Sequence, residues 1–329
     1  AIAVTGHPLQ SQTTEPVKIM QEFTPVRTTK LNEGLYVFDL AQNMSGIPKI
    51  TVKGNKGDTV KIFPAELINA DGTVNQQATG RPHFYQYILK GTGEETWQPS
   101  FTYYGFRYLQ VEKVVVKNEN NIKQLPELLS VKGLHISNAA KQIGTFSSSN
   151  SLFNQTDKLI DWSIKSNMVS VFTDCPHREK LGWLEQTYLV GSSVKYGYDI
   201  ATLCRKTIAD ITHAQTDKGL IPEIAPEFVK FDEPFRDSPE WGSAGIILPW
   251  LMYQWYGDKK LLQENYGMMK NYINYLQSKD SARILLQGLG DWFDLGPNRP
   301  GISQLTPKGL TATATYYYVA KLMQQIASL

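Results

Sequence analysis

Residues 173–186 (TDCPHREKLGWLEQ) concentrate ionisable side chains in one short stretch. Pro176 lacks a backbone donor and disfavours helix at the residue before it, so we expect a loop that leads into a helix. Carboxylates at a helix start are stabilised by the positive end of the helix dipole. One interpretation is a site that handles protons. The alternative is a solvated loop in which Asp174 caps a helix and Arg178 pairs with Glu179.

Two further clusters, residues 238–242 (SPEWG) and 290–294 (GDWFD), place tryptophan beside carboxylates in expected loops. A flat aromatic face can stack on the C–H face of a sugar, while neighbouring carboxylates accept hydrogen bonds from its hydroxyls. A single tryptophan is more often part of a core. However, Trp183, Trp241 and Trp292 each stand beside acidic residues at an expected helix–loop junction, and together they favour carbohydrate binding.

Carboxylates combined with aromatic side chains suit glycoside hydrolysis. In that reaction one carboxyl protonates the leaving oxygen, and a second carboxylate activates water or attacks the sugar. Glu179 is the candidate acid. Trp183 follows it by four residues, so a helix that started at Glu179 would place the carboxyl and the indole on one face. We expect burial beside Trp183 to favour the protonated carboxyl.

The composition argues against several other functions. The 33 Lys and Arg balance 31 Asp and Glu to a net charge of +2, which removes the attraction that nucleic acid or an anionic membrane surface requires. No apolar run approaches the ~20 residues of a membrane-spanning helix, and no glycine-rich phosphate motif is present. Cys175 and Cys204 provide neither a disulfide framework nor a four-ligand zinc site, and Cys175 is more readily a structural thiol than a nucleophile. We predict no metal and no cofactor.

The sequence changes character near residue 145. Before it, β-branched and aromatic runs alternate with glycine turns, which is typical of an antiparallel β-sandwich. The expected strands are 36–40, 50–52, 59–63, 85–89 and 106–111. After it, apolar residues recur at helical spacing, and Ser149 or Asn150 can cap the first helix. The further helices are expected at 183–198, 200–214, 241–256, 259–278 and 309–328. We therefore place a β-sandwich domain in residues 1–145 and a helical domain in residues 146–329.

Residues 174–183 (DCPHREKLGW) resemble the central motif of the α-L-rhamnosidases of glycoside hydrolase family 78. The likeness continues in the family's order through IPEIAP at 221–226, Trp241-Gly242 and Gly290-Asp291-Trp292, and upstream through 36–43 and 101–108. It spans nearly the whole chain. The resemblance implies a β-sandwich followed by the N-terminal part of an (α/α)6 barrel. It also implies hydrolysis of terminal, non-reducing α-L-rhamnose from glycosides or polysaccharides, with inversion.

The resemblance assigns roles to individual residues. Glu179 matches the general acid. The side chains that would bind rhamnose are Asp174, Arg178, Trp183, Glu185, Gln186, Trp241, Asp291 and Trp292. The charged and polar side chains of this set would bind ring hydroxyls, and the three indoles would pack against the sugar ring and its methyl group. The family commonly has Asp after the Gly-Trp pair, where this chain has Glu185 and Gln186.

The resemblance places the general base in later barrel helices, beyond residue 329, so we expect a truncated barrel. Two other functions stay open: an inactive carbohydrate-binding fragment, and a lyase acting on a rhamnose-containing polysaccharide. The expected partner is a rhamnose-containing oligosaccharide or glycoside, not nucleic acid. The first ten residues show no export signal, and we expect a periplasmic or secreted location rather than a cytoplasmic one.

Overall fold

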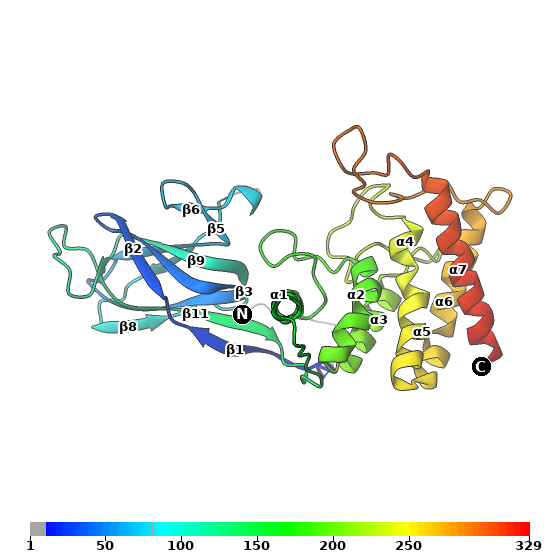
Figure 1. The fold of residues 1–329 in the computed structure, drawn as a ribbon, viewed down its shortest axis with the longest axis horizontal. Coiled ribbons are helices and arrows are strands. Elements are labelled where there is room, and N and C mark those ends of the chain that lie inside the picture. Colours follow the sequence, from blue (N-terminus) through cyan, green and yellow to red (C-terminus); the bar gives the residue numbers. More distant parts are fainter. Residues whose placement is uncertain (1–10, 80–81) are drawn as a thin grey trace, which may run out of the picture. The chain divides into compact units, whose positions relative to one another are not determined.

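The computed structural model describes residues 11–79 and 82–329, so the first ten residues, in which no export signal was found, lie outside it. The described residues form two compact units (Figure 1). The sheet unit consists of residues 17–139 and 146–181. The helical unit is built on residues 182–329, together with residues 140–145 and the described part of 1–16.

Within the described residues, the sheet unit holds one nine-stranded, mainly antiparallel sheet in the order β1-β11-β3-β9-β4-β7, with β2 and β8 on β3 and β10 on β11. Its strands are β1 Val17–Phe23, β2 Arg27–Asn32, β3 Leu35–Lys53, β4 Thr59–Ala65, β7 Tyr85–Ile88, β8 Glu94–Trp97, β9 Tyr104–Glu112, β10 Val115–Val116 and β11 Glu127–Asn138. A separate hairpin pairs β5 Leu67–Ile68 with β6 Val74–Asn75.

The long strand β3 makes this sheet curl on itself. Its first half pairs with β2 and β9, and its second half pairs with β11 and β8. The pairing with β9 continues across a bend, marked by a register shift between Asp39 and Met44, where Ala41 has a left-handed φ of 64°. Asp39 holds the bend, because it accepts the Ala41 N–H at 2.8 Å and a bidentate pair from Arg107 at 2.8 and 2.9 Å. Two expected strands are therefore parts of one bent strand.

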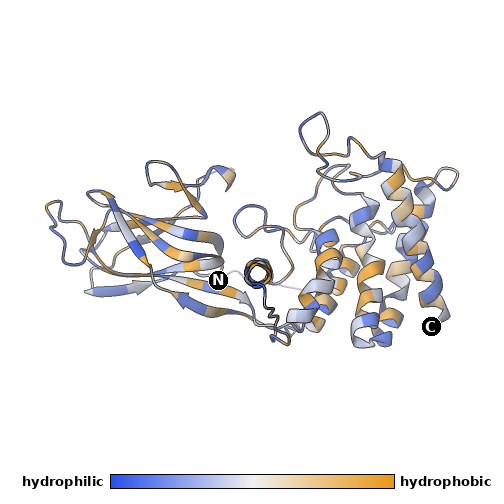
Figure 2. Ribbon diagram, viewed as in Figure 1, coloured by the Kyte–Doolittle hydropathy of each residue, from blue (hydrophilic) through white to orange (hydrophobic). Residues whose placement is uncertain are grey.

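The core of the sheet unit lies between the two halves of the curled sheet. Alternate residues of the strands point into it, as the sequence pattern predicts, and Figure 2 shows strands that carry both hydrophobic and hydrophilic segments. Its largest fully buried side chains include Tyr36, Phe106, Ile50 and Leu109. The prediction of an antiparallel β domain in the N-terminal part of the chain is confirmed.

Helix α1 (Ser151–Asn167) packs on this sheet, against β3 and β11. It begins at Asn150, whose side chain accepts the Leu152 N–H at 2.9 Å, as expected for a capping residue. Trp162 of α1 lies edge-on to Phe23, with ring centroids 5.8 Å apart. The loop after α1, through residue 181, also belongs to the sheet unit.

The helical unit contains α2 Leu184–Gly197, α3 Ala201–Ala214, α4 Pro239–Gly242, α5 Ala244–Tyr256, α6 Lys259–Lys279 and α7 Lys308–Ser328. These bounds confirm the predicted helices. Helix α5 continues in the direction of the short α4, and the other successive helices alternate in direction, which places the N-termini of α2, α4 and α7 at one end of the unit (Figure 1). The loops 215–238 and 280–307 lie at that same end. None of the described helices is long and apolar enough to cross a membrane.

Candidate active site

The loop that carries Glu179 belongs to the sheet unit, and we call residues 174–180 the acid loop. It forms turns, and helix α2 begins only at Leu184, with Trp183 as its N-cap. The expectation that Glu179 and Trp183 share one helix face is therefore wrong. Two residues interrupt a helix here: Pro176 disfavours the helical conformation before it, and Lys180 has a left-handed φ of 56°.

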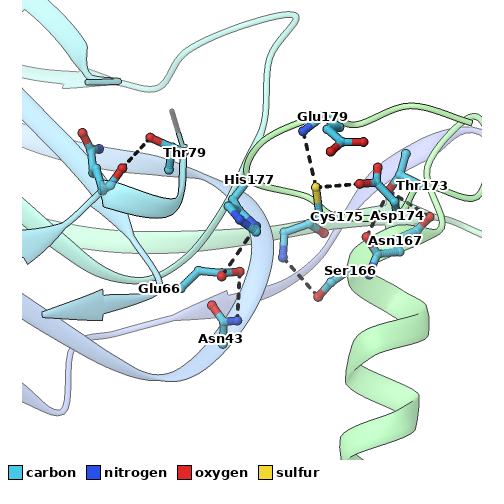
Figure 3. Close-up of polar contacts among 12 residues, drawn as sticks. Asn43, Glu66, Thr79, Ser166, Asn167, Thr173, Asp174, Cys175, His177 and Glu179 are labelled. Carbon is cyan, nitrogen blue, oxygen red and sulfur yellow. Dashed lines mark hydrogen bonds and ion pairs between the residues drawn. The ribbon is translucent and has the colours of Figure 1, made fainter. Parts of the chain in front are cut away.

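The Glu179 side chain lies at the surface of the sheet unit, with 34% of it exposed, and its Oε1 is 2.6 Å from Nη2 of Arg178. The expected burial of this carboxyl is therefore wrong. The backbone beneath it is held tightly, because the Glu179 N–H donates to Sγ of Cys175 at 3.3 Å. The Cys175 thiol in turn donates to Oδ2 of Asp174 at 3.0 Å (Figure 3).

The acid loop also presents one unusual acceptor. Oδ1 of Asp174 is buried, and it has no hydrogen-bond partner among the described residues. Burial, followed by the hydrogen bond to Asp174, raises the pKa of the Cys175 thiol. The thiol therefore stays protonated and acts as a donor, in line with a structural role rather than a nucleophilic one.

Three glutamates gather at the loop end of the helical unit. Glu185 lies in the first turn of α2, and Glu240 lies in the first turn of α4. Glu223 lies in the loop between α3 and α4, where its carbonyl accepts the Leu184 N–H at 2.9 Å and so ties this loop to the start of α2. Glu223 and Glu240 are buried, with 1% and 8% of their surfaces exposed.

Burial changes the protonation of these glutamates. It raises the pKa of Glu185 to about 7, and the charges of Glu240 and Asp291 add to this effect. Burial likewise raises the pKa of Glu223 to about 8, although Ser238 opposes the shift, and it raises the pKa of Glu240. Within the described part of the chain, no carboxyl oxygen of Glu223 or Glu240 has a hydrogen-bond partner of good geometry. At neutral pH Glu223 therefore holds a proton.

Sequence reasoning assigned no individual role to Glu223, and it considered Glu240 only as a carboxylate beside Trp241. Their motifs, residues 221–226 and 238–242, show only a glutamate directly after a proline. That pattern is common in solvated loops and carries no sign of burial. Only the packing of the helices around the two carboxyls distinguishes them from surface glutamates.

The three tryptophans differ in how accessible they are. Trp241 is buried, with 4% of its surface exposed. Trp183 is partly buried and stacks on Phe231, with ring centroids 5.3 Å apart. Trp292 is 38% exposed and lies edge-on to Phe235. Trp183 and Trp292 thus keep open surface at the loop end of the helical unit, whereas Trp241 packs in its interior.

Loop 280–307 holds Asp291 in a fixed, exposed position. Gly290 before it has a φ of +74°, and a Cβ there would lie 2.7 Å from Cβ of Ser303. Asp294 accepts two backbone N–H groups from the far side of the loop at 2.9 and 2.8 Å.

Gln186, also a candidate site residue, is partly buried in the first turn of α2. Across residues 11–79 and 82–329, no group of three or more His, Cys, Asp or Glu could hold a metal ion.

Two family models match this order of a curled antiparallel sheet followed by helical hairpins, with carboxyls and tryptophans at one end of the hairpins. Residues 29–137 match the model of the bacterial alpha-L-rhamnosidase concanavalin-like domain. Residues 141–329 match that of the bacterial alpha-L-rhamnosidase 6 hairpin glycosidase domain. The chain belongs to the bacterial α-L-rhamnosidase family, which confirms the resemblance found in the sequence.

Individual relatives agree with this assignment. An alpha-L-rhamnosidase of Formosa agariphila is 30% identical over 98% of this chain and 35% of its own length. The solved alpha-L-rhamnosidase from Dictyoglumus thermophilum is 30% identical with a TM-score of 0.86, over 97% of this chain and 35% of its own. The Streptomyces avermitilis alpha-L-rhamnosidase, solved in complex with L-rhamnose, is 30% identical with a TM-score of 0.84, over 97% of this chain and 29% of its own. The chain thus spans about a third of the length of these relatives.

Proposed function

We propose that the protein carrying this chain removes terminal, non-reducing α-L-rhamnose from glycosides or polysaccharides by hydrolysis with inversion. The observation that carries the proposal is the family match, which covers both units and includes the acid loop. The relatives are named alpha-L-rhamnosidases, and one of them binds L-rhamnose in its solved structure.

Glu179 is the proposed general acid. A proton donor must reach the oxygen of the leaving group, and the exposed carboxyl of Glu179 can do so. The guanidinium of Arg178, proposed to bind ring hydroxyls, lies 2.6 Å from this carboxyl. The unpartnered Oδ1 of Asp174 is suited to accept a hydrogen bond from a sugar hydroxyl, because a buried acceptor without a partner is unfavourable until it is satisfied.

The family resemblance also assigns contacts to rhamnose to side chains of the helical unit. The open faces of Trp183 and Trp292 would pack against the ring and its methyl group, and the resemblance assigns the same role to Trp241, of which 4% is exposed. The polar groups proposed to bind hydroxyls are Glu185, Gln186 and Asp291. Inversion requires a second carboxylate roughly 6.5–9.5 Å from the acid to admit water. We place this general base outside residues 1–329, as the family resemblance implies.

The test is the variant Glu179→Gln in the full-length enzyme, assayed on an alkyl α-L-rhamnoside. We expect kcat to fall by about 10²–10⁴-fold, because the leaving group is no longer protonated. Glu94→Gln, which changes an exposed glutamate of β8, is the matched control and should leave kcat unchanged. Proton NMR of the wild-type reaction should show β-L-rhamnose as the first product.

Other outcomes would point elsewhere. Full activity of Glu179→Gln would remove this residue from the role of acid. An initial α-anomer would contradict inversion. An unsaturated product that absorbs in the ultraviolet would indicate a lyase, and rhamnoside binding without any release would indicate a carbohydrate-binding protein.

A further inference from the structure

The acid loop is fastened at both ends to one short segment of the sheet unit, residues 103–105 at the start of β9. The first attachment is a close approach of backbone and ring. A Cβ on Gly105 would lie 2.7 Å from Cγ of Pro176 and 3.2 Å from Cβ of His177, so only glycine lets the loop approach the strand this closely.

A polar pair secures the same end. Nδ1 of His177 lies 3.6 Å from Oε2 of Glu66, which follows β4. The Asn43 side chain of β3 donates to the other oxygen of Glu66 at 3.1 Å. Figure 3 shows these side chains of the sheet pointing toward the acid loop. Strands β3, β4 and β9 therefore all contribute to holding its first turn.

The second attachment is Lys180, directly after Glu179. Its Nζ donates to the backbone carbonyl of Tyr103 at 2.6 Å. The same ammonium lies 4.7 Å from the ring centroid of Tyr103 and 4.9 Å from that of Tyr104. A hydrogen bond combined with two cation–π contacts is a strong attachment for one lysine. It also explains why Lys180 tolerates a left-handed φ of 56°, a conformation that persists where surrounding contacts impose it.

We propose that Lys180 is a positioning residue, which fixes the end of the acid loop to β9 and thereby sets where the Glu179 carboxyl lies. The inference rests on the proposed role of Glu179 as general acid. The backbone of Glu179 is then fixed from both sides, by the Cys175 thiol at its N–H and by the anchored Lys180 after it. The sheet unit takes part in catalysis by holding the proton donor, although β9 supplies no reacting group.

The test compares Lys180→Met, Lys180→Arg and Lys113→Met in the full-length enzyme. Lys113 is the matched control, because it follows the other end of β9 with a left-handed φ of 62° and its side chain is exposed. Two substrates are used. Methyl α-L-rhamnoside has a poor leaving group, which needs a proton to depart, whereas the leaving group of 2,4-dinitrophenyl α-L-rhamnoside departs without one. A residue that positions the acid affects the first substrate selectively, whereas general damage to the fold affects both.

For Lys180→Met we expect kcat on the methyl glycoside to fall by about 10- to 100-fold, as a misplacement near 1 Å would cause. The dinitrophenyl glycoside should be affected far less. Lys180→Arg should recover most of the activity, because arginine keeps the charge and stacks on aromatic rings. Equal losses on both substrates, or no loss on either, would overturn the proposal.

A second readout does not depend on activity. Cys204 is fully buried and Cys175 is not, so labelling of the folded 329-residue chain with Ellman's reagent reports on the acid loop. Lys180→Met should speed the labelling of Cys175 several-fold relative to Lys113→Met. An unchanged rate would overturn the proposed attachment of the acid loop through Lys180. If Glu179→Gln itself lowers activity equally on both substrates, the proposed acid fails, while faster labelling would still support the attachment of the loop.

Discussion

The buried carboxyl of Glu223 makes the stability of this protein depend on pH in a defined direction. Its pKa is about 8 in the folded chain, against an ordinary value of 4.5, because burial disfavours the charged form. Between these two values the folded protein binds one proton more than the unfolded chain. The stability that comes from this group is therefore fully present below pH 4.5 and is lost as the pH rises through 8.

The size of the effect follows from the two pKa values. Each pH unit in this window removes about 1.4 kcal/mol of the free energy of unfolding, and the loss between pH 5 and pH 8 amounts to about 3.5 kcal/mol. In the variant Glu223→Gln this dependence should disappear, since glutamine carries no titrating proton. Burial of the amide adds a free-energy difference that is the same at every pH, so it cancels from the slope.

The assay is urea unfolding of the 329-residue chain at pH 5, 6, 7 and 8, followed by circular dichroism at 222 nm. The stability of Glu223→Gln relative to wild type should rise with pH by the amount given above. Glu264→Gln is the control, because it changes a glutamate of α6 whose side chain is 53% exposed and paired with Lys260. A difference between Glu223→Gln and wild type that stays constant from pH 5 to pH 8 would refute the reasoning.

Two further predictions concern other parts of the chain. Glu95 accepts backbone N–H groups, first that of Lys90, which lowers its pKa to about 2. Its contribution to stability is present above pH 4.5 and is lost as the pH falls toward 2, so Glu95→Gln should unfold more easily than wild type at pH 6 but equally easily near pH 2 in acid titrations. Gly290→Ala should destabilise the chain by about 1–3 kcal/mol, because alanine is strained at φ +74° and meets a neighbouring side chain. Gly267→Ala in α6, where a Cβ has open space, should show no such loss of melting temperature.

Local sequence was enough to predict most elements. Apolar residues at helical spacing between proline, glycine and aspartate loops predicted 200–214 and 259–278, which became α3 and α6. Ser149 or Asn150 was predicted as the cap of the first helix, because either side chain can accept a hydrogen bond from a backbone N–H of the first turn, and Asn150 takes that role. The bend in β3 was not predicted, because it depends on Arg107, which is distant in sequence and binds Asp39 at the turn.

The candidate site likewise has features that local sequence predicts and features that depend on contacts between distant segments. The sequence by itself determined the family, the order of the elements and the identity of the motif around Glu179, since each of these is written in neighbouring residues. The tertiary structure alone decided which carboxyls meet water. Glu179 keeps 34% of its side chain exposed in a loop that Lys180 attaches to Tyr103, 77 residues away, while Glu223 is buried by segments that come together only on folding. Burial is a property of contacts between segments distant in sequence, and local spacing carries no record of them.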